Sequence, residues 1–160
     1  MGKFFTTLRR SLLASLLVVL VVLLSSCDVV SGDALGGPQP PPSGSLSVSF
    51  IDVGQGDGVL VQAGGTNHLI DAGRPEEGPN VVDFLRSRGV RELDGIVVTN
   101  PDADHIGGFL DVFEAFEVER VYVSGDPKGT LTYNSFLRGV SEEGSEVEVV
   151  RAGRRLEWGG

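Results

Sequence analysis

Residues 99–108 read Thr-Asn-Pro-Asp-Ala-Asp-His-Ile-Gly-Gly, and this stretch decides how the rest of the chain is interpreted. It places four oxygen or nitrogen donors within six residues: Asn100, Asp102, Asp104 and His105. Alternate residues of an extended loop point the same way, so the first three are positioned to converge on one cation while His105 turns towards a neighbouring one. The glycine pair that follows allows a tight backbone turn into a helix. The pattern therefore indicates a cation site on a loop that leads into a helix.

The same loop has a second interpretation that involves no cation. A run such as Asn-Pro-Asp-Ala-Asp is also typical of a helix start, where Asp102 or Asp104 caps the helix and the acidic side chains favour the positive end of its dipole. The residues alone do not decide between cation ligands and a helix cap.

The segments on both sides of the loop predict strands and helices in alternation. Residues 46–53 alternate apolar and polar side chains at first, and 58–62 with 66–71 form a hairpin through Gly64-Gly65. Further strands are expected at 96–98, 120–124 and 147–150, and helices around 81–85, at 109–116 and at 133–140. A hairpin followed by strand-helix alternation predicts mixed α/β layers. We expect the strands at 96–98 and 121–123 to leave an apolar face that a second half of the fold must cover.

Composition excludes several classes of function. The chain has 160 residues and a net charge of -9, and beyond Lys3, Arg9 and Arg10 only 10 basic residues face 22 acidic ones. Phosphate affinity comes largely from counterions displaced by basic side chains, so this body cannot hold nucleic acid by a broad basic face. The single cysteine excludes an internal disulfide and a cysteine-rich zinc module.

The first 26 residues have the pattern of an export signal. A basic start precedes an apolar run at 12–24, which is shorter than the ~20 residues that a membrane span needs. Leu24-Ser-Ser-Cys27 resembles a bacterial lipobox, which implies cleavage after residue 26 and a lipid on Cys27. An ordinary cleaved secretory signal is the alternative. The lipobox interpretation predicts an extracytoplasmic protein, anchored by lipid to the bacterial cell membrane.

Residues 27–45 are rich in Gly, Ser and Pro, with four of the eight prolines between 38 and 42. Such a segment buries little apolar surface, so we expect an extended tether followed by a domain over 46–160.

Three motifs in order resemble the metallo-β-lactamase superfamily. Residues 99–108 look like its His-x-His-x-Asp-His metal motif, in the His-x-Asp-x-Asp-His form of the hydrolase domain of ComEC-type DNA-uptake proteins. Residues 51–58, Ile-Asp-Val-Gly-Gln-Gly-Asp-Gly, are similar to the family's entry strand and loop, and 69–73, Leu-Ile-Asp-Ala-Gly, to its next strand. The resemblance implies an α/β fold, an αββα sandwich, of which this chain supplies the first half only.

The resemblance also implies roles for single residues. Asp102 would contact a first metal ion, and Asp104 and His105 a second, with Asp104 beside the attacking water as the catalytic candidate. Asn100 stands where the family has its first histidine, and a neutral amide is a poorer ligand for a transition metal than imidazole. The first site should therefore be weak.

Three further residues are assigned around the metal ligands by the same resemblance. Asp71 would orient the metal site, while Asp57 and Gln55 would border the cleft. The other histidine, His68, lies upstream in a predicted strand, and we expect it to be a surface or core residue.

The function implied is a metal-dependent hydrolase with one or two divalent ions, Zn or Mn, related to ComEC-type competence proteins. Two cations about 3.5 to 4 Å apart activate a bridging water and steady a leaving oxygen, which suits phosphodiesters such as DNA. The family draws further ligands from its second half, and no histidine follows His105. We therefore expect a truncated chain that binds metal weakly and is an enzyme only when a C-terminal half completes it.

Two alternatives remain open at this stage. One is a non-catalytic surface binding module, or an inactive fragment, in which Asn100 marks a decayed metal site. The other is a hydrolase of small esters or lactams, because fold alone does not fix chemistry.

Overall fold

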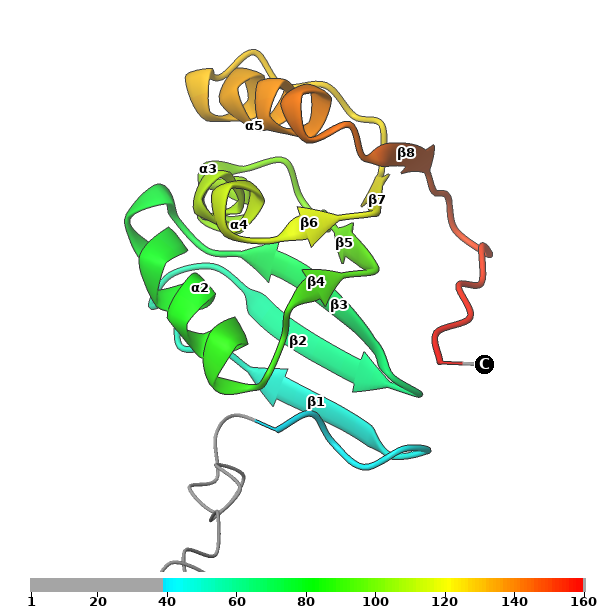
Figure 1. Cartoon of the computed structure of the whole chain (residues 1–160). Coiled ribbons are helices and arrows are strands. Elements are labelled where there is room, and N and C mark those ends of the chain that lie inside the picture. Colours follow the sequence, from blue (N-terminus) through cyan, green and yellow to red (C-terminus); the bar gives the residue numbers. More distant parts are fainter. Residues whose placement is uncertain (1–38, 160) are drawn as a thin grey trace, which may run out of the picture. The chain divides into compact units, whose positions relative to one another are not determined.

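A six-stranded mixed sheet forms the centre of the protein in the computed structural model, which describes residues 39–159 (Figure 1). The strand order is β1-β2-β3-β5-β7-β8, antiparallel among the first three and parallel from β3 onwards. The strands are β1 (Leu46–Phe50), β2 (Gly58–Ala63), β3 (Thr66–Ala72), β5 (Gly95–Val97), β7 (Arg120–Val123) and β8 (Glu146–Val149). Because β3, β5 and β7 are parallel, the loops that follow them meet at one edge of the sheet.

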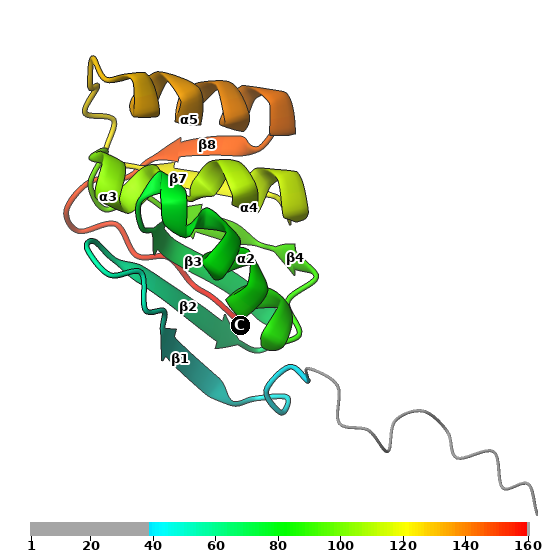
Figure 2. The ribbon, with the colours of Figure 1, turned by 90° about the vertical axis from the view of Figure 1, so that its left-hand side faces the viewer.

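Helices cover one face of this sheet (Figure 2). They are a 3-10 turn, η2 (Pro75–Glu77), and the α-helices α2 (Gly78–Ser87), α3 (Ala103–Ile106), α4 (Phe109–Ala115) and α5 (Leu131–Glu143). Two short strands, β4 (Glu92–Leu93) and β6 (Glu117–Val118), pair in parallel as a separate sheet. One sheet with one helical layer is half of the four layers of an αββα sandwich, as the sequence predicts.

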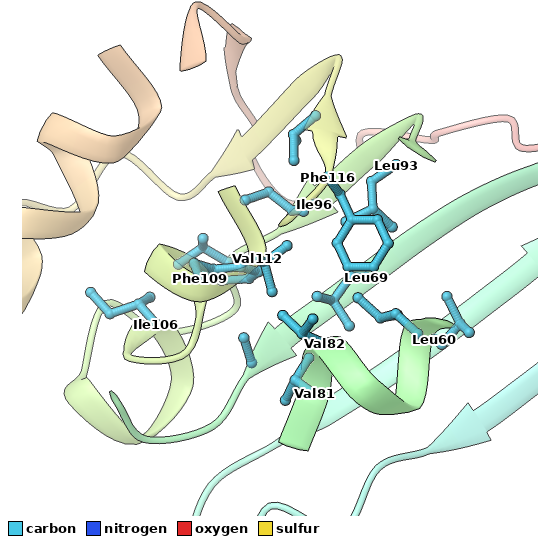
Figure 3. Close-up of a cluster of buried hydrophobic side chains, with 14 of the residues drawn as sticks. Leu60, Leu69, Val81, Val82, Leu93, Ile96, Ile106, Phe109, Val112 and Phe116 are labelled. Carbon is cyan, nitrogen blue, oxygen red and sulfur yellow. The ribbon is translucent and has the colours of Figure 1, made fainter. Parts of the chain in front are cut away.

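The core lies between the sheet and the helices (Figure 3). Leu60, Leu69, Ile96 and Val121 are neighbours across four strands and are fully buried. Apolar side chains of α2 and α4 pack against this row, including Val81, Leu85, Phe109 and Val112. Because successive strand residues point to opposite faces, this row marks the side of the sheet that the helices cover.

The apolar surface that remains exposed is not where the sequence analysis placed it. The sequence analysis predicts an uncovered apolar face on β5 and β7. This is wrong for the face packed against α4, because Ile96, Val98 and Val121 are buried there. The exposed apolar side chains of the sheet's first strand are instead Leu46, Val48 and Phe50, on its other face, and Phe50 is 80% exposed.

His68 lies in the interior, one of the two places the sequence analysis allowed for it. The residue is 4% exposed, and its ring stacks on Trp158 with ring centroids 4.2 Å apart. Nε2 lies 3.2 Å from the hydroxyl of Thr66. Burial lowers the pKa of His68, because the charged imidazolium would lose its hydration there. The residue is therefore built into the sheet on the face opposite the helices.

The expected signal peptide and Cys27 lie outside the described residues. Residues 39–45 of the expected tether contain a turn and neither helix nor strand. Within residues 39–159, no helix combines the length and apolar character needed to cross a membrane.

Candidate metal centre

Three loops meet beyond the ends of β3 and β5, and the backbone of Gly73 joins them. Its N–H donates to the carbonyl oxygen of Asp57 at 2.9 Å. Its own carbonyl accepts the N–H groups of Gly107 at 2.9 Å and Gly108 at 3.3 Å. The loop before β2, the end of β3 and the loop after β5 are therefore fixed relative to one another.

The turn before β2 approaches the loop after β5 so closely that one position admits only glycine. Gly56 has a φ of +104°, and a Cβ there would overlap the carbonyl oxygen of Asp104. The neighbouring Gln55 donates from Nε2 to the Asp104 Oδ2 at 3.1 Å. Gln55 thus lies at the border of the site, as the resemblance implies, and holds one carboxylate oxygen of Asp104.

Asp71 is the buried anchor of the site. Its side chain is fully buried, and its carboxylate accepts the backbone N–H of Thr99 at 2.9 Å and the Thr99 hydroxyl. The same carboxylate lies 2.8 Å from Nδ1 of His105. Both oxygens are engaged, so Asp71 is placed to orient the imidazole rather than to take a cation itself.

His105 is held through Nδ1, which leaves Nε2 facing the Asp104 carboxylate. Nε2 lies 4.0 Å from Asp104 Oδ1, and the His105 side chain is 16% exposed. Burial by itself would lower the pKa of His105, but the hydrogen bond and charge of Asp71, with the charges of Asp104 and Asp57, raise it overall. The His105 imidazole is therefore surrounded by negatively charged carboxylates.

His105 Nε2 and Asp104 Oδ1 lie 4.0 Å apart and are the two donors that would hold a divalent cation. Imidazole and carboxylate are both ordinary ligands of Zn²⁺. Asp57 lies near the other ring nitrogen, with Oδ2 3.6 Å from His105 Nδ1, and its side chain is 67% exposed.

A second grouping contains three donors. Among the described residues, ligand atoms of Asp57, Asp71 and His105 lie within 4.8 Å of one another. The hydrogen bonds of Asp71 to Thr99 and His105 occupy its oxygens, so we favour the pair of Asp104 and His105 Nε2 as the donors.

Asp102 and Asn100 do not converge with Asp104 in the way an extended loop would arrange them. Asp102 pairs with Lys128, with Oδ1 2.6 Å from Nζ. Asn100 Oδ1 accepts the backbone N–H of Asp102 at 3.2 Å and thereby closes a local turn. The physical reason is that α3 begins at Ala103, so the alternation of an extended chain ends before Asp104.

The helix-cap interpretation is correct for the position of Asp102 but wrong for the capping hydrogen bond. Asp102 occupies the N-cap position of α3, but its side chain makes no capping hydrogen bond. Asp104 lies in the first turn and bonds Gln55 instead.

Sequence reasoning missed Lys128 and Thr99. Thr99 directly precedes the donor residues, but nothing in its type indicates that it binds Asp71. Lys128 follows β7, and its position beside the donor loop could have been found only from the parallel pairing of β5 with β7.

The sequence profile of the metallo-beta-lactamase superfamily matches residues 51–132, which include every donor discussed above. The chain belongs to this superfamily. The resemblance stated from the three motifs is thereby confirmed. Members of this superfamily usually bind divalent metal ions, so a divalent metal is the expected ligand of this centre.

Within the superfamily, the curated relatives include competence proteins. ComE operon protein 3 of Bacillus subtilis (strain 168) is 29% identical over 139 residues, which cover 74% of this chain and 18% of that protein. Competence protein ComA of Neisseria gonorrhoeae is 37% identical over 76 residues, 47% of this chain and 11% of that protein. The chain thus matches less than a fifth of either relative.

Solved structures of superfamily members are similar over about half of the chain. The metallo-beta-lactamase SMB-1 in complex with mercaptoacetic acid has a TM-score of 0.44 and 20% identity, over 54% of this chain and 34% of that one. A diphosphatase of the PhnP family has a TM-score of 0.39 and 25% identity, over 59% of this chain and 37% of that one.

Proposed function

We propose that this chain carries the metal-binding part of a metal-dependent hydrolase that cleaves phosphodiesters, with DNA as the substrate class. The observation that carries the proposal is the position of His105, whose Nδ1 is held by Asp71 while Nε2 lies 4.0 Å from the Asp104 carboxylate. Membership of the superfamily supports metal-dependent hydrolysis. The names of the two competence proteins support a DNA-related substrate.

Each residue of the centre has a part in this chemistry. A divalent ion, Zn or Mn, supplies an activated water and neutralises developing charge on the phosphate. His105 and Asp104 would bind it, and both imidazole and carboxylate suit these metals. Asp71 keeps the His105 ring in one orientation, and we assign Asp104 as the group that would accept a proton from the attacking water. Asp57 and Gln55 would line the substrate's approach.

The chain is acidic, so an anionic substrate would have to be bound through metal ions and not through a basic surface. The net charge is -9, and the donors of the centre are acidic. An anionic phosphodiester would therefore approach only a metal-loaded site, and activity should depend strictly on the metal.

Placement at the membrane is a second part of the proposal. The lipobox-like Leu24-Ser-Ser-Cys27 and the following tether support an extracytoplasmic domain, 46–160, held at the cell membrane by a lipid on Cys27.

One observation favours a non-catalytic binding module as the second candidate function. Asn100 stands where the family has its first histidine, and its side-chain oxygen already accepts the Asp102 N–H, so this position offers a metal neither an imidazole nor a free amide oxygen. Metal binding without turnover would be the signature of this alternative.

Hydrolysis of bis-p-nitrophenyl phosphate and of DNA, with Mn²⁺ or Zn²⁺, tests the proposed function. The protein should be produced as its gene encodes it, because the chain matches only a small part of its relatives. We expect activity that EDTA removes and that Asp104→Asn lowers by about 100-fold or more, since a positioned acid-base group contributes that much.

His68→Phe is the matched control, because it keeps an aromatic ring against Trp158 on the other face of the sheet. It should retain most of the activity. Turnover that is unaffected by EDTA, or equal in Asp104→Asn and the parent, would contradict the proposal. Hydrolysis of lactams or small esters, without hydrolysis of phosphodiesters, would contradict the proposed substrate class.

A further inference from the structure

Residues 150–159, which follow β8, lie across the sheet face that the helices leave open (Figures 1 and 2). This segment is termed the strap. It begins beside β7, where the Val150 N–H donates to the carbonyl oxygen of Val123 at 2.9 Å. It ends at the turn between β2 and β3, where Gly159 lies so close to Gly64 that a Cβ on either glycine would overlap backbone atoms. The strap therefore crosses the open face from β8 to β2.

Ring stacking attaches the far end of the strap to the sheet. The Trp158 indole lies on the His68 imidazole, with ring centroids 4.2 Å apart and ring planes 12° from parallel. Among the hydrogen bonds of residues 39–159, none joins 155–159 to another part of the chain. This end is thus held by packing alone, and it can separate from the sheet without breaking a hydrogen bond.

The hydrogen bonds of His68 define where its ring carries a proton. The Thr66 hydroxyl donates to the Ala63 carbonyl oxygen at 2.8 Å, so the hydroxyl oxygen is left to accept from His68 Nε2 at 3.2 Å. The neutral ring therefore has its proton on Nε2, and Nδ1 is a bare acceptor. Nδ1 is buried and has no hydrogen-bond partner.

A second proton on His68 would have no acceptor while the strap is in place. A Cβ on Gly95 would lie 3.2 Å from Nδ1 and 2.9 Å from the Tyr122 ring, so the space beside Nδ1 is too tight for a methyl group. Protonation would thus create a buried, charged N–H that is unpaired, which is costly. Trp158 Nε1 is buried without a partner as well. Both nitrogens would regain water if the strap lifted.

We propose that the strap is a pH-sensitive cover of the open sheet face, and that protonation of His68 releases it. Neutral His68 stacks against Trp158, whereas the imidazolium needs water that only the released state supplies. Release would uncover both rings on the face where Val48 and Phe50 are already exposed, so this face would present more apolar surface in acid. The inference is independent of the metal centre, which lies beyond the ends of β3 and β5.

Charged groups around His68 act on it in both directions. Asp94, which precedes β5, and Glu119, which precedes β7, favour the charged ring, and Arg120 of β7 disfavours it. From the strap, Trp158 brings no charge, and the neighbouring Glu157 is exposed. Burial outweighs these charges and lowers the pKa of His68.

The direction of the pH effect follows from this burial. The state with the strap in place binds a proton less readily than the released state, in which His68 is hydrated and returns towards its ordinary pKa of ~6.5. The strap is therefore fully held above that pH, and its attachment weakens as the pH falls towards the lowered pKa of the buried ring.

The single tryptophan of the chain reports on the strap directly. The test is the Trp158 emission of the 160-residue chain, with acrylamide as the quencher, from about pH 8 to about pH 5. We expect emission to move to longer wavelength and quenching by acrylamide to rise as the pH falls, because the indole becomes hydrated. The ratio of released to attached strap should rise by about tenfold for each pKa unit that burial removes from His68.

Two variants separate His68 from other groups that titrate. His68→Phe keeps an aromatic ring under Trp158 and cannot be protonated, so its emission should stay at the short wavelength throughout. His105→Asn removes the other histidine and should keep the response of the parent. Circular dichroism at each pH checks that the sheet and helices persist.

The pKa of His68, measured by NMR of the imidazole C–H groups, gives a second and independent test. Trp158→Ala removes the ring that covers His68, so the pKa should rise towards ~6.5. An equal pKa in the parent and Trp158→Ala would overturn the proposal. So would a wavelength shift that survives in His68→Phe. A loss of intensity without a shift or added quenching would show that the imidazolium stays stacked on the indole as a cation–π pair, which also contradicts release.

Discussion

Asp71→Ala is expected to lower the free energy of unfolding by about 3 to 5 kcal/mol, as is typical when one partner of a buried charged pair is removed. The carboxylate is fully buried and serves the Thr99 N–H, the Thr99 hydroxyl and His105 Nδ1 together. Its loss leaves these groups without their partner and frees the imidazole to turn. Urea unfolding at neutral pH measures the change.

Asp71→Asn is the matched variant for this prediction. Asp71 has a φ of +55°, a conformation that asparagine tolerates well, so the backbone should be preserved. The amide oxygen can still accept the Thr99 N–H, and we expect a smaller loss of stability. The pKa of His105 should fall in this variant, because the Asp71 hydrogen bond and charge raise it. A loss below about 1 kcal/mol in Asp71→Ala would contradict the role of Asp71 as the anchor.

The second large effect is expected at Gly56. Gly56→Ala adds a Cβ that overlaps the Asp104 carbonyl oxygen at a φ of +104°, so the turn and the donor loop must separate. We expect a loss of about 2 to 4 kcal/mol in unfolding free energy, from overpacking together with left-handed strain. Metal affinity should fall as well, because Asp104 is displaced.

Gly54→Ala is the control for Gly56→Ala. Gly54 also has a positive φ, +62°, but a Cβ there meets nothing within 4 Å. It should cost only the conformational strain, about 1 to 2 kcal/mol, and should leave metal binding intact. Equal behaviour of the two variants would show that the close approach to Asp104 does not matter for the site.

Much of the fold follows from local patterns in the sequence. The alternation in 46–50, the Gly64-Gly65 turn and the short apolar run at 96–98 each matched a strand or hairpin of the sheet. The four elements that were missed are η2, α3, β4 and β6, and each is four residues or shorter. Segments of that length contain no full hydrophobic period, and their pairing depends on neighbours distant in the sequence.

The site was predictable where a motif specified it and not where tertiary contact decided it. Asp71 lies against His105, 34 residues further along the chain, as the resemblance implies for a residue that orients the centre. The predicted convergence of Asn100, Asp102 and Asp104 is not found, because α3 begins at Ala103 and Lys128 binds Asp102. Lys128 has no signal of its own in the sequence, since only the parallel sheet brings its loop to this edge.

The most direct test of the metal centre is a calorimetric titration of the 160-residue chain with Mn²⁺ and with Zn²⁺. The account predicts saturable binding that weakens by at least about tenfold in Asp104→Ala and His105→Ala. It predicts nearly unchanged binding in His68→Phe, whose ring stacks on Trp158 away from the donor loop. Equal losses at His68 and His105, or no loss at Asp104 and His105, would contradict it.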